Sequence, residues 1–178
     1  MGDRLLEIEL SVLQNRAERL AVPVEASEHN LELEKLLVFR SMESRFALPL
    51  SQVEAVTRIA DIITIPHTPA HIQGVVRRRG QTIALVNLRF FFNPNAEALI
   101  DEDYAVVVLV KGKLFALQVE DVEGVSIQMK SDIFDPPESY DQRLRPYLLG
   151  ITVTDEMAIL NLDAIATTPN FGTTPIEG

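Results

Sequence analysis

Four pairs of short apolar segments, each joined by a tight turn, constrain the fold of this chain more than any other feature. The pairs cover residues 36–40 and 45–50, 72–76 and 82–86, 104–110 and 114–119, and 149–154 and 157–162. Gly80 and Gly112 stand in two of the turns, where glycine readily supplies a positive φ. Long helical segments are missing between most of the pairs, which argues against alternating strands and helices. We therefore predict an all-β fold, either a barrel or a sandwich.

The core of such a fold must be built from aliphatic side chains. Hydrophobic residues make up 47% of the 178, but aromatic residues only 6%, and Trp and Cys are absent. Without cysteine the chain has neither a disulfide framework nor a thiolate metal site, which is compatible with a reducing compartment. The formal net charge of −10 disfavours nucleic acid, and no stretch approaches the ~20 apolar residues of a membrane helix. We expect a soluble cytoplasmic protein that binds no nucleic acid and does not insert into a membrane.

The first 33 residues differ from the rest of the chain. Apolar residues recur at a spacing of three to four over residues 5–21, which predicts an amphipathic helix, and Pro23 ends it before a polar linker. The apolar stripe must be covered somewhere. We expect it to pack on the folded body of its own chain, with docking to another component as the alternative. The chain thus divides into the helix and linker 1–33, a folded body 34–167 and a flexible tail 168–178.

Two short helical turns are predicted inside the β-rich body. Ser51 can cap one that runs through Val56, and Asn87 can cap another that runs through Phe92. Both are too short to change the fold class.

No constellation of reactive side chains emerges from the sequence. His67 and His71 have the spacing of a helical metal pair, but Pro69 between them opposes that helix, so we interpret both as loop residues. His29 has no evident partner, and the acidic run 101–103 is typical of a solvated turn. Phosphate-binding glycine loops and the G-x-S-x-G nucleophile motif are missing. We predict no catalytic residues, no cofactor and no metal.

One dense basic cluster stands out in this acidic chain. Arg77, Arg78 and Arg79 lie together at the predicted turn before Gly80. Guanidinium groups pair with carboxylates in bidentate fashion, so the cluster is a candidate contact for an acidic partner surface. A solvated hairpin tip is the alternative.

The order of the hairpins and the residues at their junctions resemble the CheW-like domain, an adaptor module of bacterial chemosensory systems. The resemblance spans residues 36–165. Its elements are Phe46-Ala47-Leu48-Pro49-Leu50 with Val53 and Val56; Ile72, Gly74, Val75 and Val76 before Arg79-Gly80; Val86-Asn87-Leu88; Leu117, Val119, Glu120, Val122 and Val125; and Tyr147, Leu148 and Gly150.

The resemblance implies two small five-stranded SH3-like barrels, packed together with a groove between them. It also implies an adaptor without turnover, which couples methyl-accepting receptors to a CheA-like histidine kinase. The regulatory domain of the kinase would bind one barrel, and the helical tip of the receptor would enter the groove. The adaptor would be cytoplasmic and recruited to receptor arrays at the inner membrane.

Carried over to this chain, the resemblance points to partner contact at Val53, Val56, Gly74 and Arg79, and the charge pattern adds Arg77 and Arg78. Gly74 has a structural alternative, because a glycine inside a strand often permits close backbone approach.

The chain departs from the family at several positions. Ala55 stands where the family often has glutamate, and Arg77 where asparagine is usual. If residues 51–56 are helical, Glu54 cannot replace that glutamate, because adjacent helical side chains point about 100° apart. The alternative function, from another class, is a small-molecule-binding or enzymatic β-barrel; nucleic-acid binding ranks below it.

Overall fold

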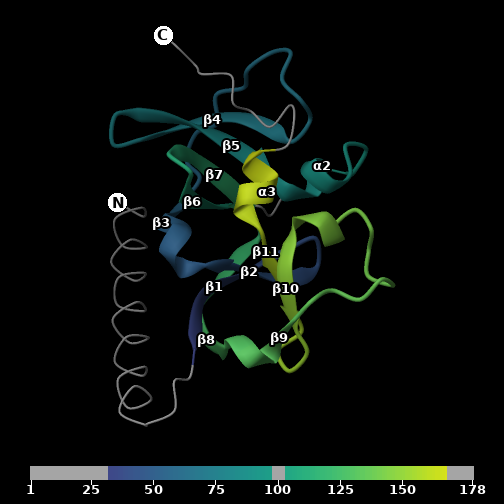
Figure 1. Ribbon diagram of the computed structural model, residues 1–178. Helices are drawn as coiled ribbons and strands as arrows, with labels where there is room; N and C mark the ends of the chain where they lie inside the picture. The colour runs from purple at the N-terminus through teal and green to yellow at the C-terminus, as the bar shows by residue number, and fades with distance from the viewer. Residues whose placement is uncertain (1–31, 98–102, 168–178) are drawn as a thin grey trace.

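The computed structural model describes residues 32–97 and 103–167, which form two β-sheets joined by short helices (Figure 1). The predicted N-terminal helix over residues 5–21, His29 and the predicted tail lie outside the described residues. The prediction of an all-β fold made of two small barrels is confirmed. We call the six-stranded sheet the first barrel and the five-stranded sheet the second barrel.

The second barrel contains β3 (Val53–Arg58), β4 (Ile72–Arg78), β5 (Gln81–Asn87), β6 (Tyr104–Val110) and β7 (Lys113–Val119). Their order across the sheet is β3-β6-β7-β5-β4. The hairpins β4–β5 and β6–β7 are antiparallel, and β5 pairs with β7 in parallel. Strands β3 and β4 are therefore the two edges of this sheet.

The first barrel repeats this arrangement with β1 (Leu33–Ser41), β2 (Ser44–Pro49), β8 (Asp121–Met129), β10 (Leu148–Thr152) and β11 (Met157–Leu160). The order is β8-β1-β2-β11-β10, and β2 pairs with β11 in parallel. A sixth, two-residue strand, β9 (Ile133–Phe134), adds to β10. The expected count of five strands is thus wrong for this barrel, because the predicted hairpins did not account for the segment that enters β10.

Within residues 32–97 and 103–167 the chain crosses between the barrels twice. Strand β2 is followed through the short helix η1 (Leu50–Gln52) by β3 of the second barrel, and β7 is followed directly by β8 of the first. The helices η2 (Lys130–Asp132), η3 (Arg145–Tyr147), α2 (Leu88–Phe92) and α3 (Leu162–Ala166) complete the described elements. In Figure 1, α3 lies at the junction between the upper, second barrel and the lower, first barrel.

The predicted hairpin turns are present. Arg79 and Gly80 have φ values of 49° and 78°, and Lys111 and Gly112 have 50° and 78°. Two consecutive positive φ values are the geometry of a two-residue turn whose twist matches that of the flanking strands. This geometry fixes the register of β4–β5 and β6–β7, in which Arg78 faces Gln81 across the strands.

Three apolar clusters build the core. The largest contains residues of both sheets, among them Leu37, Phe46, Val106 and Leu117, so the two barrels share it. A smaller cluster around Ala55, Val76, Ile83, Leu85 and Val107 belongs to the second barrel, and another formed by Leu36, Val38, Ala47, Met157 and Ile159 belongs to the first. The shared cluster fixes the barrels against each other, because removing apolar area from water dominates folding energetics.

The two predicted helical turns have different outcomes. Asn87 does cap α2, since its side-chain oxygen accepts a hydrogen bond from the backbone N–H of Arg89 at 2.9 Å. The predicted helix from Ser51 to Val56 is wrong: only a single 3-10 turn precedes Val53, where β3 begins. A strand wins here because β-branched valines pack well on a half-buried pleated surface and pair with the valines of β6.

Candidate partner-binding site

Val53 and Val56 lie on β3 with their side chains in the shared core. Their exposed fractions are 7% and 4%. Each therefore offers almost no surface to a partner, and what they contribute is the position of β3 at the edge of the second barrel. Direct partner contact at these two residues stays a prediction that the burial does not favour.

Gly74 lies on the other edge strand, β4, at a point where the register to β5 shifts. Its φ is +143°, and a Cβ at this position would collide with the carbonyl oxygen of Ile63 and come within 2.9 Å of the Ile62 side chain. The backbone of Ile63 pairs with Val75 through two hydrogen bonds of 2.9 Å. Gly74 thus allows the β3–β4 connection to lie directly against β4, which is the structural alternative given above.

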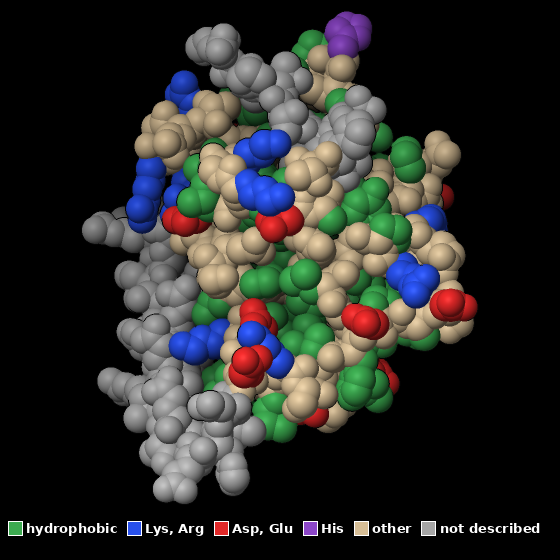
Figure 2. Space-filling model, in the orientation of Figure 1, with side chains coloured by type: hydrophobic (Ala, Val, Ile, Leu, Met, Phe, Trp, Pro, Cys, Tyr) green, Lys and Arg blue, Asp and Glu red, His purple; other side chains and the backbone are tan. Residues whose placement is uncertain are grey.

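The three arginines lie at the end of β4 and in the turn that follows it. Arg77 and Arg79 are exposed and Arg78 is half-buried. Lys and Arg side chains gather on the left of Figure 2, over the β4–β5 hairpin. The basic cluster is therefore a surface feature of the second barrel.

A pocket of about 260 Å³ lies between the two edge strands of the second barrel. Its apolar lining comes from the small cluster inside that barrel, including Val76, Ile83 and Val107. Arg58 on β3 and Arg77 and Arg78 on β4 form the rim. We call this site the arginine-rimmed pocket.

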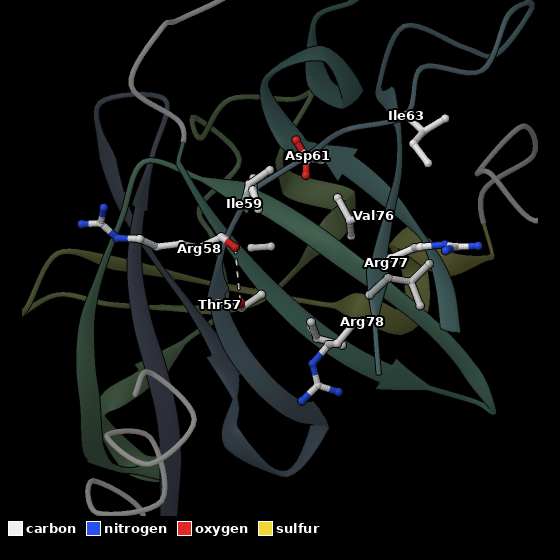
Figure 3. Close-up of a pocket in the computed structure, with 12 residues that line it drawn as sticks. Thr57, Arg58, Ile59, Asp61, Ile63, Val76, Arg77 and Arg78 are labelled. Carbon is white, nitrogen blue, oxygen red and sulfur yellow. Dashed lines mark hydrogen bonds between the residues drawn. The ribbon is translucent and has the colours of Figure 1, made fainter. Parts of the chain in front are cut away.

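The side chains on the rim diverge around the opening (Figure 3). The guanidinium groups of Arg58 and Arg77 point to opposite sides, and Arg78 lies at a third. Arg58 is held by a hydrogen bond from its Nη2 to the Tyr104 hydroxyl at 3.1 Å, and its guanidinium lies 5.3 Å from the centre of that ring. An apolar centre inside a cationic rim suits a protein surface with an apolar anchor and carboxylates around it.

Sequence reasoning missed Arg58, Asp61 and Ile63, which line the same pocket. Arg58 was hidden because residues 51–56 were expected to be helical, so that a strand ending at Arg58 was not foreseen. Asp61 and Ile63 belong to a loop, and only the bridge between Ile63 and Val75 brings them to β4. Residues 53–58 do not alternate between buried and exposed positions, so no period-two signal in the sequence could have placed Arg58 on a strand.

The strand also corrects the expectation about Ala55 and Glu54. Ala55 is fully buried in the cluster inside the second barrel, whereas Glu54 is exposed on the opposite face. Glu54 therefore does not replace the missing glutamate, because its side chain is exposed where that of residue 55 is buried, and the reason is not a helical rotation. Ala55 instead keeps the interior next to the arginine-rimmed pocket apolar.

Comparison with known proteins decides the family. A model of the CheW-like domain matches residues 35–169. The chain belongs to the CheW-like domain family. It is 30% identical over 119 residues to the protein FrzA of Myxococcus xanthus, covering 66% of this chain and 73% of FrzA. It is 21% identical over 138 residues to the chemotaxis protein CheW of Treponema pallidum, covering 75% and 81% of the two chains.

The fold agrees with this assignment. The scaffolding protein TtCheW from Thermoanaerobacter tengcongensis superposes with a TM-score of 0.69 at 24% identity, over 80% of this chain and 94% of that chain. The predicted family and its chemosensory adaptor class are confirmed.

In this CheW-like domain the junction between the barrels carries a cluster of aromatic rings, of which Phe92 is buried and the others are half-buried. Phe91 of α2 contacts Tyr147 of η3 edge-on at 5.1 Å between ring centres, and Phe92 lies 5.8 Å from the same tyrosine. His71 packs edge-on against Phe91 at 5.4 Å. We call these four residues the junction cluster. The junction cluster thus connects the residue just before β4, His71, to the residue just before β10, Tyr147.

A carboxylate also bridges the barrels of this CheW-like domain. Glu120 lies where the chain passes from β7 to β8, and its Oε1 accepts hydrogen bonds from Arg89 Nη2 at 3.0 Å and from the backbone N–H of Met42 at 3.1 Å. Arg89 belongs to α2, next to the second barrel, and Met42 to the β1–β2 turn of the first. Both charged side chains are mostly buried, so this contact is stronger than an exposed ion pair.

The two described histidines of this CheW-like domain lie in a loop, as predicted. His67 and His71 both lie in the β3–β4 connection, outside helices and strands. In residues 32–97 and 103–167, no three His, Asp or Glu side chains come together in a way that could hold a metal ion. Within the same ranges no helix is long and apolar enough to cross a membrane.

Proposed function

We propose that this CheW-like protein couples the helical tips of chemoreceptors to the regulatory domain of a CheA-like histidine kinase. The match of residues 35–169 to the family is the observation that carries this proposal. The protein acts by holding two partners together, and it turns over no substrate. It works in the cytoplasm, at receptor arrays on the inner membrane.

The kinase contact is placed at the arginine-rimmed pocket. An aliphatic side chain of the kinase domain enters the apolar centre of the pocket. Carboxylates of the kinase domain pair with the guanidinium groups of Arg77 and Arg79. Three buried residues do not contact the kinase but shape the mouth of the pocket. Val53 and Val56 hold β3 in place, and Gly74 holds the β3–β4 connection in place. The predicted partner-contact residues thus divide into arginines that touch the kinase and buried residues that position them.

The receptor contact is placed at the junction cluster, where α2 and η3 meet between the two barrels. Half-buried aromatic rings such as Phe91 and Tyr147 give apolar area at a low cost in side-chain entropy. A helical hairpin tip offers a row of apolar side chains on one face, which is the complement of such a surface.

The test is capture of a CheA-like kinase from cell extract by the immobilised full-length chain. We expect wild type to recover the kinase and the double variant Arg77→Glu/Arg79→Glu to recover at least about tenfold less, since reversing rim charges opposes carboxylates on the partner. Arg143→Glu is the matched control, because Arg143 is an exposed arginine in a loop of the first barrel. Equal recovery by wild type and the double variant would contradict the pocket assignment, and no recovery by wild type would contradict the adaptor function.

A further inference from the structure

The first barrel has an open apolar end that corresponds to the arginine-rimmed pocket of the second. Its inner cluster, which includes Leu36 and Ile159, opens into a pocket of about 280 Å³. Glu34, Pro49, Lys130, Ile133, Leu149 and Ile159 line this pocket. We call it the β1-entry pocket, because Glu34 stands at the start of β1. Engineered cavities of about 150 Å³ admit benzene, so the β1-entry pocket has room for a leucine side chain.

Large apolar side chains remain exposed at Leu149, which lines this pocket, and at Phe134 and Met129, which are next in sequence to the lining residues Ile133 and Lys130. Phe134 is 52% exposed, Leu149 49% and Met129 37%. Figure 2 shows apolar side chains at the surface over β9 and β10. Exposed apolar side chains at and beside an open pocket are typical of a site that is covered by another segment or protein.

The rim of the β1-entry pocket differs in charge from that of the arginine-rimmed pocket. It carries one acid, Glu34, and one base, Lys130, whereas three arginines and one acid, Asp61, line the arginine-rimmed pocket. A rim with balanced charges does not select a strongly acidic partner. It fits an occupant that is apolar on one face and carries charges of both signs on the other.

The chain itself supplies such a segment and delivers it to this place. The amphipathic segment 5–21 contains three glutamates and two arginines beside its apolar stripe. The described chain begins at Glu32, whose carbonyl accepts a hydrogen bond from the backbone N–H of Lys130 at 2.9 Å and whose carboxylate lies 3.5 Å from Lys130 Nζ. The entry point of the N-terminal segment is therefore fixed at the rim of the pocket.

The linker is long enough to return the segment to the pocket. Residues 22–31 span at most about 35 Å when fully extended. A tether of this length raises the local concentration of the segment to about the millimolar range, so even weak binding keeps the site occupied.

We propose that residues 5–21 dock as an amphipathic helix on the β1-entry pocket of their own chain and insert leucine side chains into its mouth. The docked segment completes the small inner core of the first barrel and covers Leu149 and Phe134. This inference concerns the first barrel alone and does not depend on which partner binds the arginine-rimmed pocket.

Limited trypsin digestion of the full-length chain, followed by mass spectrometry, tests the proposal. Docking protects the bonds after Arg16 and Arg19, because a protease cleaves only the opened segment. We expect Leu149→Asp to accelerate these cleavages about tenfold. Leu109→Asp is the matched control, because Leu109 is 42% exposed on the second barrel, and it should leave the rate unchanged. Melting curves of both variants verify that the barrels stay folded.

A double-mutant cycle separates docking from an effect on the helix alone. Leu13→Asp in the apolar stripe should accelerate cleavage as much as Leu149→Asp, and the double variant should be no faster than either. Additive acceleration, or an unchanged rate in Leu149→Asp, would overturn the proposal. Protection that disappears on dilution would overturn it as well, since it would assign the pocket to a second copy of the chain.

Discussion

Gly74→Ala tests whether this glycine holds the pocket together or contacts the partner. A Cβ at residue 74 would meet the carbonyl oxygen of Ile63 and the side chain of Ile62, and the φ of +143° is one that alanine rarely adopts. Backbone strain of this kind costs about 1–3 kcal/mol, and overpacking costs about 1–3 kcal/mol more. We therefore expect Gly74→Ala to lower the free energy of unfolding by about 2–6 kcal/mol.

The matched control for this experiment is Gly80→Ala in the β4–β5 turn. Gly80 also has a positive φ, +78°, but a Cβ there would meet nothing within 4 Å. Gly80→Ala should therefore lower the free energy of unfolding only by the cost of the left-handed backbone conformation, which is about 1–2 kcal/mol. The two variants thus separate the cost of the conformation from the cost of the close approach to Ile63.

Thermal unfolding followed by circular dichroism is a suitable assay. For a domain of 150–250 residues, 1 kcal/mol shifts the Tm by about 2–4 °C, so we expect Gly74→Ala to melt about 4–24 °C below wild type. A Tm no lower than that of Gly80→Ala would refute the reasoning from close approach. Loss of kinase capture at an unchanged Tm would show that Gly74 contacts the partner directly.

Two further predictions concern contacts outside the pocket. Glu120→Ala removes the acceptor shared by Arg89 and a backbone amide of the β1–β2 turn, and should lower the free energy of unfolding in urea by about 1–3 kcal/mol. Glu123→Ala removes a more exposed ion pair and should lower it by about 0–1 kcal/mol. Equal losses in the two variants would contradict this prediction. The pKa of Tyr140 is raised first by burial and then by the nearby charge of Asp141, so Asp141→Asn should lower that pKa partway; an absorbance titration that shows no change would refute the electrostatic part.

The hairpins were predictable because their determinants are local. A glycine in a two-residue turn and apolar residues on either side fix β4–β5 and β6–β7 without reference to the rest of the chain. The cap at Asn87 was predictable for the same reason, since its acceptor and donor are two residues apart. Such signals are short in range and lie within a single stretch of sequence.

The arginine-rimmed pocket was only half predictable, because it forms between strands that are distant in the sequence. Arg77 and Arg78 are recognisable in the sequence because they are adjacent, but Arg58 comes near them only when the second barrel brings β3 opposite β4. The error over residues 51–56 has the same origin. The choice of strand over helix there depends on the pairing of Val56 with Val106 of β6, which no local pattern reveals.

Recruitment of the kinase to receptors tests the adaptor function most directly. Vesicles that carry a chemoreceptor are mixed with purified CheA-like kinase and sedimented, with and without the full-length chain. We predict that the kinase sediments with the vesicles only when the chain is present, and that Arg77→Glu/Arg79→Glu abolishes this recruitment while the variant chain itself still sediments through the junction cluster. The same amount of sedimented kinase with and without the chain would contradict the proposed function.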